Sequence, residues 1–157
     1  MKKKLLRIGI AVLLCVLIGF LSSIATQTSI STWYVTLKKP FFTPPNWLFA
    51  PVWSILYVTM GIAAGIVWSK GFYHKWVKTA LYHFGFQLLL NAAWSIFFFG
   101  MRNPLIALVD ILALFILLLF TIKWFKVVNS TAAYLLIPYL IWVAFAAALN
   151  FSIWQLN

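Results

Sequence analysis

The sequence of 157 residues has almost no acidic side chains and few charged residues of any kind. Asp110 is the only aspartate or glutamate, and charged residues make up 8% of the chain. Because a soluble domain carries about 25% charged residues, this composition cannot cover a water-facing surface. Hydrophobic residues make up 65% of the chain, and the mean hydropathy is +1.03. These values exclude an ordinary soluble domain and predict that lipid surrounds most of the chain.

Residues that could support catalysis or bind a metal are also scarce. A single cysteine, Cys15, excludes an intrachain disulfide and a multi-cysteine metal site. One carboxylate leaves no pair for acid–base catalysis. Neither His74 nor His83 belongs to a cluster with metal-ligand spacing. We therefore expect no metal site and no required cofactor, with His74 near water or headgroups and His83 in packing; haem ligation by His83 is the alternative.

Five apolar runs are long enough to cross a bilayer core of about 30 Å. A chain in lipid must satisfy its backbone hydrogen bonds internally, and runs without strict alternation favour helices over barrel strands. The expected fold is therefore an all-α membrane protein with one domain over residues 1–157, a bundle of five transmembrane helices. A cleavable signal peptide is the alternative for the first run. The spans are expected near residues 5–25, 47–68, 79–99, 104–124 and 132–154.

The net charge of +11 comes from basic residues at the ends of these runs, which excludes a nucleic-acid-binding patch. The positive-inside rule then predicts a cytoplasmic N-terminus, with the first loop and the C-terminus external. On the N-terminal side of the spans lie nine basic residues: Lys2, Lys3, Lys4, Arg7, Lys70, Lys75, Lys78, Lys123 and Lys126. The opposite side has three: Lys38, Lys39 and Arg102.

Residues 26–46 form a long connection rich in proline and aromatic residues. Pro40, Pro44 and Pro45 suppress regular helix, and Pro51 falls in the first turns of the next span, where proline is tolerated. Interleaved aromatic residues make the connection amphipathic, so it can fold over the bundle as a lid. The alternative is an interfacial aromatic belt joined to a connector.

Polar residues inside the predicted spans are candidates for function or for interhelical hydrogen bonds. Asp110 lies about 9 Å into its span by helical rise, and an ionisable residue at that depth is costly. Its alternative role is a protonated or hydrogen-bonded carboxyl that fixes helix packing. Gln87, Asn91 and Trp94 follow one helical stripe, which could equally join helices. Small residues at Gly61, Ala64 and Gly65 favour close helix contact within the bundle or in a homodimer.

Helical rise also gives the depth of several side chains below the external surface. Trp53, Asn91, Asp110, Trp142 and Ala146 are expected at about 9 to 18 Å. They can therefore share one cavity in the external half, beneath the proline-rich connection. Their spacing leaves open whether they face one another.

One pattern along the chain resembles the signature of the TspO/MBR family. It runs Trp33-Tyr34, Pro44-Pro45, Trp47, Pro51-Val52-Trp53, Tyr57 and Met60-Gly61, and continues in Asn91-Ala-Ala-Trp94, Ala107-Leu-Val-Asp110 and Pro138 to Asn150. The resemblance implies five retained helices and a pocket under the first loop that takes porphyrins and isoquinoline- or benzodiazepine-type ligands. By match to the family motifs, the pocket would be lined by Tyr34, Trp53, Tyr57, Asn91, Trp94, Asp110, Trp142, Phe145 and Ala146.

The resemblance implies a membrane receptor or sensor for porphyrin-type tetrapyrroles. Its partners would be membrane lipid, a porphyrin or another hydrophobic small molecule, and a second copy in a homodimer. Two alternatives stay open: a light-dependent porphyrin-degrading enzyme that uses Trp53 and Trp142, and a transporter of tetrapyrroles or sterols. Sterols are disfavoured because Phe151 and Gln155 replace the tyrosine and the base of the family's C-terminal sterol consensus.

Overall fold

A computed structural model describes residues 1–157, which fold into helices joined by turns, without strands. The all-α class expected from the apolar runs is therefore confirmed. Two short turns lie between the long helices: the 3-10 turn η1 in the connection between α1 and α2, and the π-helical turn η2 directly after α3. In chain order the elements are α1 (Lys2–Ser29), η1 (Tyr34–Thr36), α2 (Asn46–Trp68), α3 (Lys75–Ser95), η2 (Ile96–Gly100), α4 (Pro104–Val128), α5 (Ser130–Leu135) and α6 (Ile137–Leu156).

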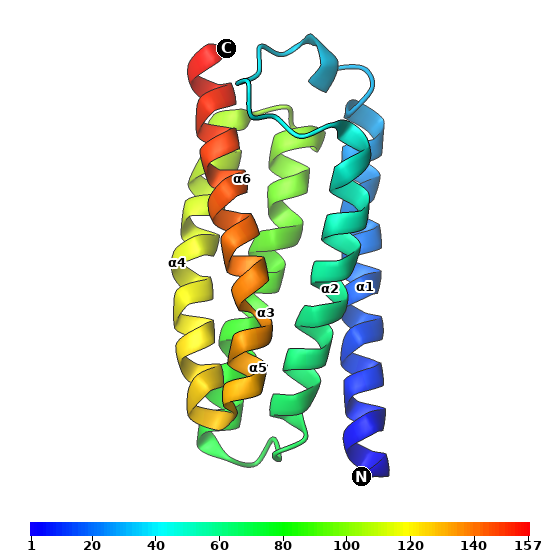
Figure 1. Cartoon of the computed structure of the whole chain (residues 1–157), viewed down its shortest axis with the longest axis vertical. Coiled ribbons are helices and arrows are strands. Elements are labelled where there is room, and N and C mark those ends of the chain that lie inside the picture. The colour runs from blue at the N-terminus through cyan, green and yellow to red at the C-terminus, as the bar shows by residue number, and fades with distance from the viewer.

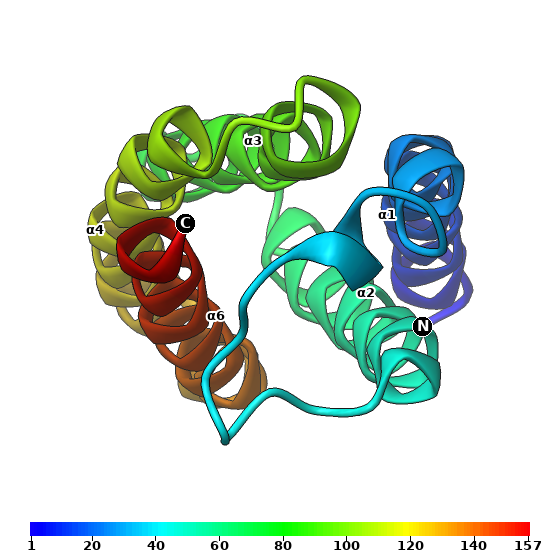
Figure 2. The ribbon, with the colours of Figure 1, turned by 90° about the horizontal axis from the view of Figure 1, so that it is seen from above.

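The long helices stand side by side and alternate in direction (Figure 1). Seen from above, they follow one another around the bundle in the order α1, α2, α6, α4 and α3 (Figure 2). The N-terminus and the α2–α3 connection lie at the lower end of Figure 1, whereas the C-terminus and residues 30–45 lie at the upper end. We use "lower" and "upper" in this sense below.

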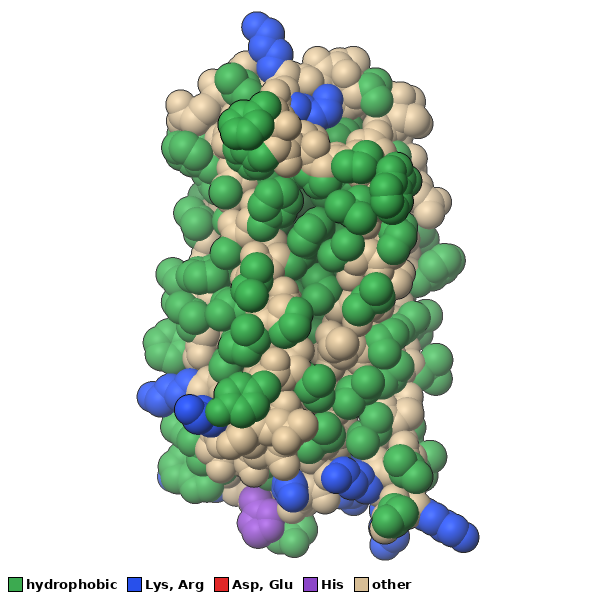
Figure 3. Space-filling model, in the orientation of Figure 1, with side chains coloured by type: hydrophobic (Ala, Val, Ile, Leu, Met, Phe, Trp, Pro, Cys, Tyr) green, Lys and Arg blue, Asp and Glu red, His purple; other side chains and the backbone are tan.

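Four helical stretches are long and apolar enough to cross a membrane: α1, α2, α4 and the run Ser130–Leu156. They make the chain a multi-pass membrane protein. The predicted third span over residues 79–99 corresponds to α3, which begins earlier and is not among the four. Lys75, Lys78, Gln87 and Asn91 lower its hydropathy, although it lies in the bundle between α1 and α4. Lysine and arginine gather at the ends of an otherwise largely apolar face (Figure 3).

Several helix boundaries differ from those expected; α4, for example, runs to Val128 instead of ending near residue 124. α1 continues to Ser29 instead of ending near residue 25, because no proline or glycine interrupts these residues and the backbone ladder runs on to the bond from Ile30 N to Thr26 O. The last predicted span breaks at Leu136 into α5 and α6. Pro138 causes this break because it has no N–H for the helical ladder. The third span ends in the π-helical turn η2.

Small residues join α1 to α2 in the lower half. A Cβ atom on Gly61 would overlap the backbone of Val12, and one on Gly65 would overlap Ile8. Of the two roles expected for these glycines, close contact within the bundle is therefore the one that the structure displays. α2 also contacts α5 at the lower end, where Ala132 is fully buried. Above this contact α2 and α6 diverge (Figure 1).

Candidate functional site

A cavity of about 480 Å³ lies in the upper half, where α2 and α6 diverge. We call it the upper cavity. Its lining comes from α1, α2, α6 and the end of α3 with η2, and 17 of the 26 lining residues are hydrophobic. Ligand pockets for small molecules typically measure about 300 to 1,000 Å³ and are mainly apolar with a few polar groups. The upper cavity therefore has the size and lining of a site for one organic molecule.

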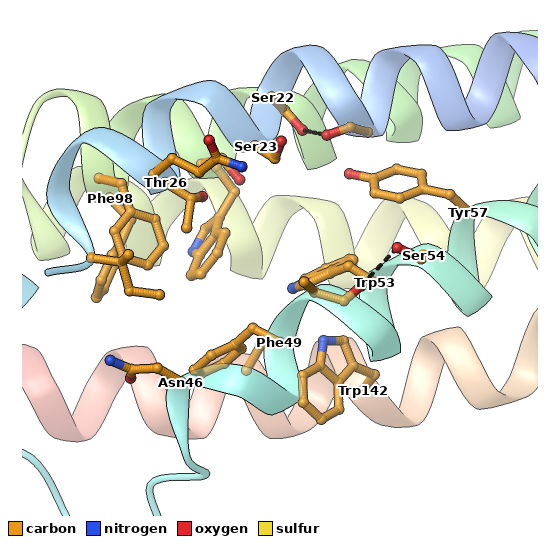
Figure 4. Close-up of a pocket in the computed structure, with 18 of the residues that line it drawn as sticks. Ser22, Ser23, Thr26, Asn46, Phe49, Trp53, Ser54, Tyr57, Phe98 and Trp142 are labelled. Atoms are coloured by element: carbon orange, nitrogen blue, oxygen red, sulfur yellow. Dashed lines mark hydrogen bonds between the residues drawn. The ribbon is translucent and has the colours of Figure 1, made fainter.

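Aromatic side chains of α2 and α6 form one side of the upper cavity. Phe49, Trp53 and Tyr57 are four residues apart, so they lie on one stripe of α2 and point toward the cavity (Figure 4). Trp142 of α6 meets them edge to face, with ring centroids 6.2 Å from Trp53 and 6.3 Å from Phe49. Such edge-to-face contacts fix the rings at steep angles to one another and leave for stacking only the faces that no neighbouring edge covers.

Residues 30–45 cross the upper end of the cavity, and Tyr34 of η1 is their main contact with it. The Tyr34 side chain is 1% exposed and packs against Phe49, Phe98 and Phe99 at centroid distances of 6.4, 6.2 and 5.6 Å. The Lys39 ammonium lies 4.9 Å from the centre of the Tyr34 ring. Residues 30–45 are therefore anchored by an aromatic side chain inserted into the bundle.

A second attachment of this segment comes from the end of α6. Asn157 Nδ2 donates to Lys38 O at 2.8 Å, and Lys38 N donates to Asn157 Oδ1 at 3.1 Å. One side chain thus pairs with both backbone groups of Lys38. These two hydrogen bonds join residues 30–45 to the end of α6.

Two buried donors that face the upper cavity have no hydrogen-bond partner, Tyr34 OH and Trp142 Nε1. Burial raises the pKa of Tyr34 to about 12, so the phenol stays protonated and keeps its O–H. An unpaired donor away from water costs roughly 1 to 3 kcal/mol, which an acceptor on a bound molecule would recover. These two groups are therefore the buried donors of the lining residues that a ligand could satisfy.

The α1 side of the cavity was not anticipated from the sequence. Gly19, Ser22, Ser23 and Thr26 lie on one stripe of α1 and line the cavity, opposite the aromatic side (Figure 4). The signal was present, because polar residues interrupt an apolar helix at helical spacing. Ser22 and Ser23 fit equally well the end of a cleavable signal peptide, which is the alternative for this span.

Below the cavity, four polar side chains form a continuous hydrogen-bonded chain, which we call the polar layer. Tyr57 OH donates to Asn91 Oδ1 at 2.7 Å, and Asn91 Nδ2 donates to Tyr139 OH at 2.6 Å. Tyr139 OH in turn donates to Gln87 Oε1 at 2.7 Å. These residues belong to α2, α3 and α6, so the polar layer ties three helices together beneath the ligand space.

The structure brings seven of the nine predicted lining residues together around the upper cavity. Asn91 is not among the residues that line it; it is buried and accepts a hydrogen bond from Tyr57. Asp110 does not line it either; it is buried on α4, and its Oδ2 has no partner. The seven that line the cavity are Tyr34, Trp53, Tyr57, Trp94, Trp142, Phe145 and Ala146.

Comparisons with known proteins match almost the whole chain. A model of the TspO/MBR family matches residues 11–155. The tryptophan-rich protein TspO of Archaeoglobus fulgidus is 47% identical over 154 residues, which cover 98% of each chain. The protein of the same name from Chlorobaculum tepidum is 45% identical over 157 residues, or 100% of this chain and 99% of that one. The translocator protein of Bos taurus is 40% identical over 140 residues, 88% of this chain and 83% of that one.

Proposed function

The chain belongs to the TspO/MBR family, and on that premise we propose that it is a membrane receptor that binds porphyrin-type tetrapyrroles in the upper cavity. The observation that carries the proposal is an aromatic cavity with two unpartnered buried donors, Tyr34 OH and Trp142 Nε1. A tetrapyrrole is flat, apolar over most of its area and carries acceptor groups at its edge. One of its faces would stack on the Trp142 ring, the nearly perpendicular Trp53 ring would meet its edge, and its acceptors would take the free donors.

The proposal includes a topology of five membrane spans, with α3 crossing alongside the four more apolar stretches. Nine of the twelve lysines and arginines lie toward the end of the bundle that holds the N-terminus, which supports a cytoplasmic N-terminus. Residues 30–45 would then be external and act as the lid of the cavity. Tyr34 is the part of the lid that a bound molecule would touch.

Titration with protoporphyrin tests the proposal. The purified protein in detergent should change the absorbance of protoporphyrin with saturation in the micromolar range. Trp142→Ala should raise Kd by about tenfold or more, equivalent to ~1.4 kcal/mol, because it removes both a stacking surface and a donor. Trp142→Phe should have a smaller effect, since it removes the N–H but keeps a smaller aromatic ring for stacking.

Trp154→Ala is the matched control. Trp154 is on the same helix, does not line the cavity and packs against Phe151, so binding should be unchanged. Equal Kd values for Trp142→Ala and the unmodified protein, or saturation that is no stronger than in empty detergent micelles, would refute tetrapyrrole binding at this site.

The contact between Trp53 and Trp142 favours a second candidate, light-dependent porphyrin breakdown. A photoexcited porphyrin in the cavity could exchange an electron with the nearer indole, and the second indole lies 6.2 Å from the first, measured between ring centroids. Dioxygen would be the oxidant whose atoms are incorporated when the macrocycle opens. Illumination of the protoporphyrin complex in air should then produce a bilin-like absorbance, and Trp53→Phe should abolish it while binding persists. Equal product from the Trp53→Phe/Trp142→Phe double variant would exclude this activity.

A further inference from the structure

A second hollow lies on the outer surface of the bundle, along α3 and α4. Five residues of α3 line it, Tyr82, His83, Phe86, Leu89 and Leu90, together with Leu117 of α4. It shares no lining residue with the upper cavity. Tyr82, Phe86 and Leu89 are each about 60% exposed on this surface. We call it the lateral groove; it is an apolar channel that faces the surroundings of the bundle.

An aromatic pair with two cations marks the end of the lateral groove nearest the lower end. Trp76 of α3 stacks on Trp124 of α4, with centroids 5.3 Å apart and ring planes 14° apart. Lys75 Nζ lies 5.2 Å from the centre of the Trp76 ring, and Lys123 Nζ lies 5.2 Å from that of Trp124. The two ammonium groups therefore flank a stacked pair that joins α3 to α4.

These cations have no carboxylate partner in the protein. The only acidic side chain, Asp110, is buried on α4. Asp110 also lies near the opposite end of α4, 13 residues before Lys123, or about 20 Å by helical rise. The lower end of the lateral groove therefore presents positive charge that the chain itself does not neutralise.

His83 adds a polar atom between the tryptophan pair and the apolar part of the groove. Its Nδ1 donates to Thr79 O at 2.7 Å, since a carbonyl can only accept. The protein's hydrogen bonds leave Nε2 without a partner, and the His83 ring lies 6.2 Å from that of Trp124. An acceptor nitrogen at this position is costly against hydrocarbon alone but suits the hydrated glycerol and ester region of a lipid, where water can donate to it.

We propose that the lateral groove binds an anionic phospholipid. Its phosphate would lie between Lys75 and Lys123, its glycerol region beside His83, and one acyl chain along Tyr82, Phe86 and Leu89. The sequence of features along the groove, from cations through aromatic rings and one polar nitrogen to apolar side chains, matches the sequence of groups in such a lipid. Basic pockets between transmembrane helices are a recognised setting for anionic headgroups.

Charge argues against a second copy of the chain as the occupant. A two-fold symmetric contact places the same patch of both copies together. Here it would bring the Lys75 and Lys123 ammonium groups of both copies toward one another without an acid between them. An anionic lipid removes this repulsion, whereas a second copy increases it.

Native mass spectrometry of the full chain in mild detergent tests the proposal with two lipids of identical acyl chains, phosphatidylglycerol and phosphatidylcholine. The protein should bind the first phosphatidylglycerol molecule about tenfold more tightly than phosphatidylcholine. Lys75→Gln/Lys123→Gln should abolish this preference, and His83→Phe should weaken the binding of both lipids, because they share the glycerol and ester region. Lys2→Gln/Lys3→Gln removes the same charge at the same end of the bundle and should leave the preference intact. All four side chains are exposed, so folding, followed by the melting temperature, should be retained.

Three results would overturn the assignment. Equal affinity for the two lipids would show that the site does not select an anion. Equal loss in the two double variants would show general charge attraction without a site. A dimer fraction that changes in His83→Phe, with lipid binding unchanged, would show that a second copy covers the groove.

Discussion

The two halves of the bundle differ in the side chains that α2 presents to its neighbours. In the lower half α2 offers Gly61 and Gly65, and α1 approaches so closely that a Cβ atom on either glycine would overlap it. In the upper half α2 offers Phe49, Trp53 and Tyr57, and these large side chains line a cavity of about 480 Å³. One helix therefore closes the bundle where its side chains are small and holds it open where they are large and aromatic.

The polar layer marks the level at which one packing mode gives way to the other. Tyr57 belongs to the cavity and to the polar layer, since its ring lines the upper cavity and its hydroxyl donates to Asn91. The ring has room on the α1 side because residue 19 is glycine; a Cβ atom there would overlap the Tyr57 ring. Small residues thus serve contact in the lower half and make space for an aromatic ring in the upper half.

Enlarging a small residue of the lower half should have the largest effect. Gly61→Leu would drive a side chain into the α1 backbone at Val12, which cannot yield as a flexible side chain could. We expect the free energy of unfolding to fall by about 3 kcal/mol or more, with much of the protein failing to fold. Unfolding in detergent, followed by circular dichroism against temperature, measures the loss.

Gly85→Leu is the matched control for this substitution. A Cβ atom on Gly85, also within a helix, meets no heavy atom within 4 Å. Leucine is a better helix former than glycine by roughly 0.5 to 1 kcal/mol, so this variant should be as stable as the unmodified protein or more so. If both variants unfold alike, close contact between α1 and α2 does not account for the closed lower half.

Breaking the polar layer should have an intermediate effect. Tyr139→Phe removes the hydroxyl that accepts from Asn91 and donates to Gln87, which leaves both amides short of a partner in a dry site. Hydrogen bonds between membrane helices contribute about 0.6 to 2 kcal/mol, so we expect a loss of ~2 kcal/mol in the free energy of unfolding. Tyr134→Phe is the control, because Tyr134 is 61% exposed. Equal stability of the two variants would mean that the polar layer does not hold the three helices together.

The sequence predicted the helices of the bundle better than the direction in which their polar side chains point. Apolar runs indicated the helices, since hydropathy depends on composition alone. Helical rise gave the depth of Asn91 and Asp110 but not the direction in which they point, which depends on helix rotation and tilt. Asn91 lies in the polar layer and Asp110 is buried on α4, so neither lines the upper cavity. Trp53 and Trp142 do line it.

α1 contributes to the cavity because α2 lies opposite it, and hydropathy cannot predict which helices face each other. Ser22, Ser23 and Thr26 are compatible with a helix end, a signal peptide or a cavity lining, and only the position of α2 opposite them selects among these. The break at Leu136, in contrast, could have been predicted from Pro138 alone, because a missing N–H acts within one turn of the same helix.

The smallest expected effect concerns the closure of the upper half by residues 30–45. Asn157→Ala removes two hydrogen bonds to the Lys38 backbone, both exposed to solvent and therefore worth little to overall stability. The melting temperature should stay unchanged, while bound protoporphyrin should dissociate about two to three times faster, equivalent to ~0.5 kcal/mol. Stopped-flow dissociation into excess apo-myoglobin measures the rate. Gln155→Ala, at an exposed neighbouring position, should leave the rate unchanged. An unaltered rate in Asn157→Ala would instead mean that residues 30–45 are held by the insertion of Tyr34 among Phe49, Phe98 and Phe99. The upper half would then be closed by packing alone, as the lower half is.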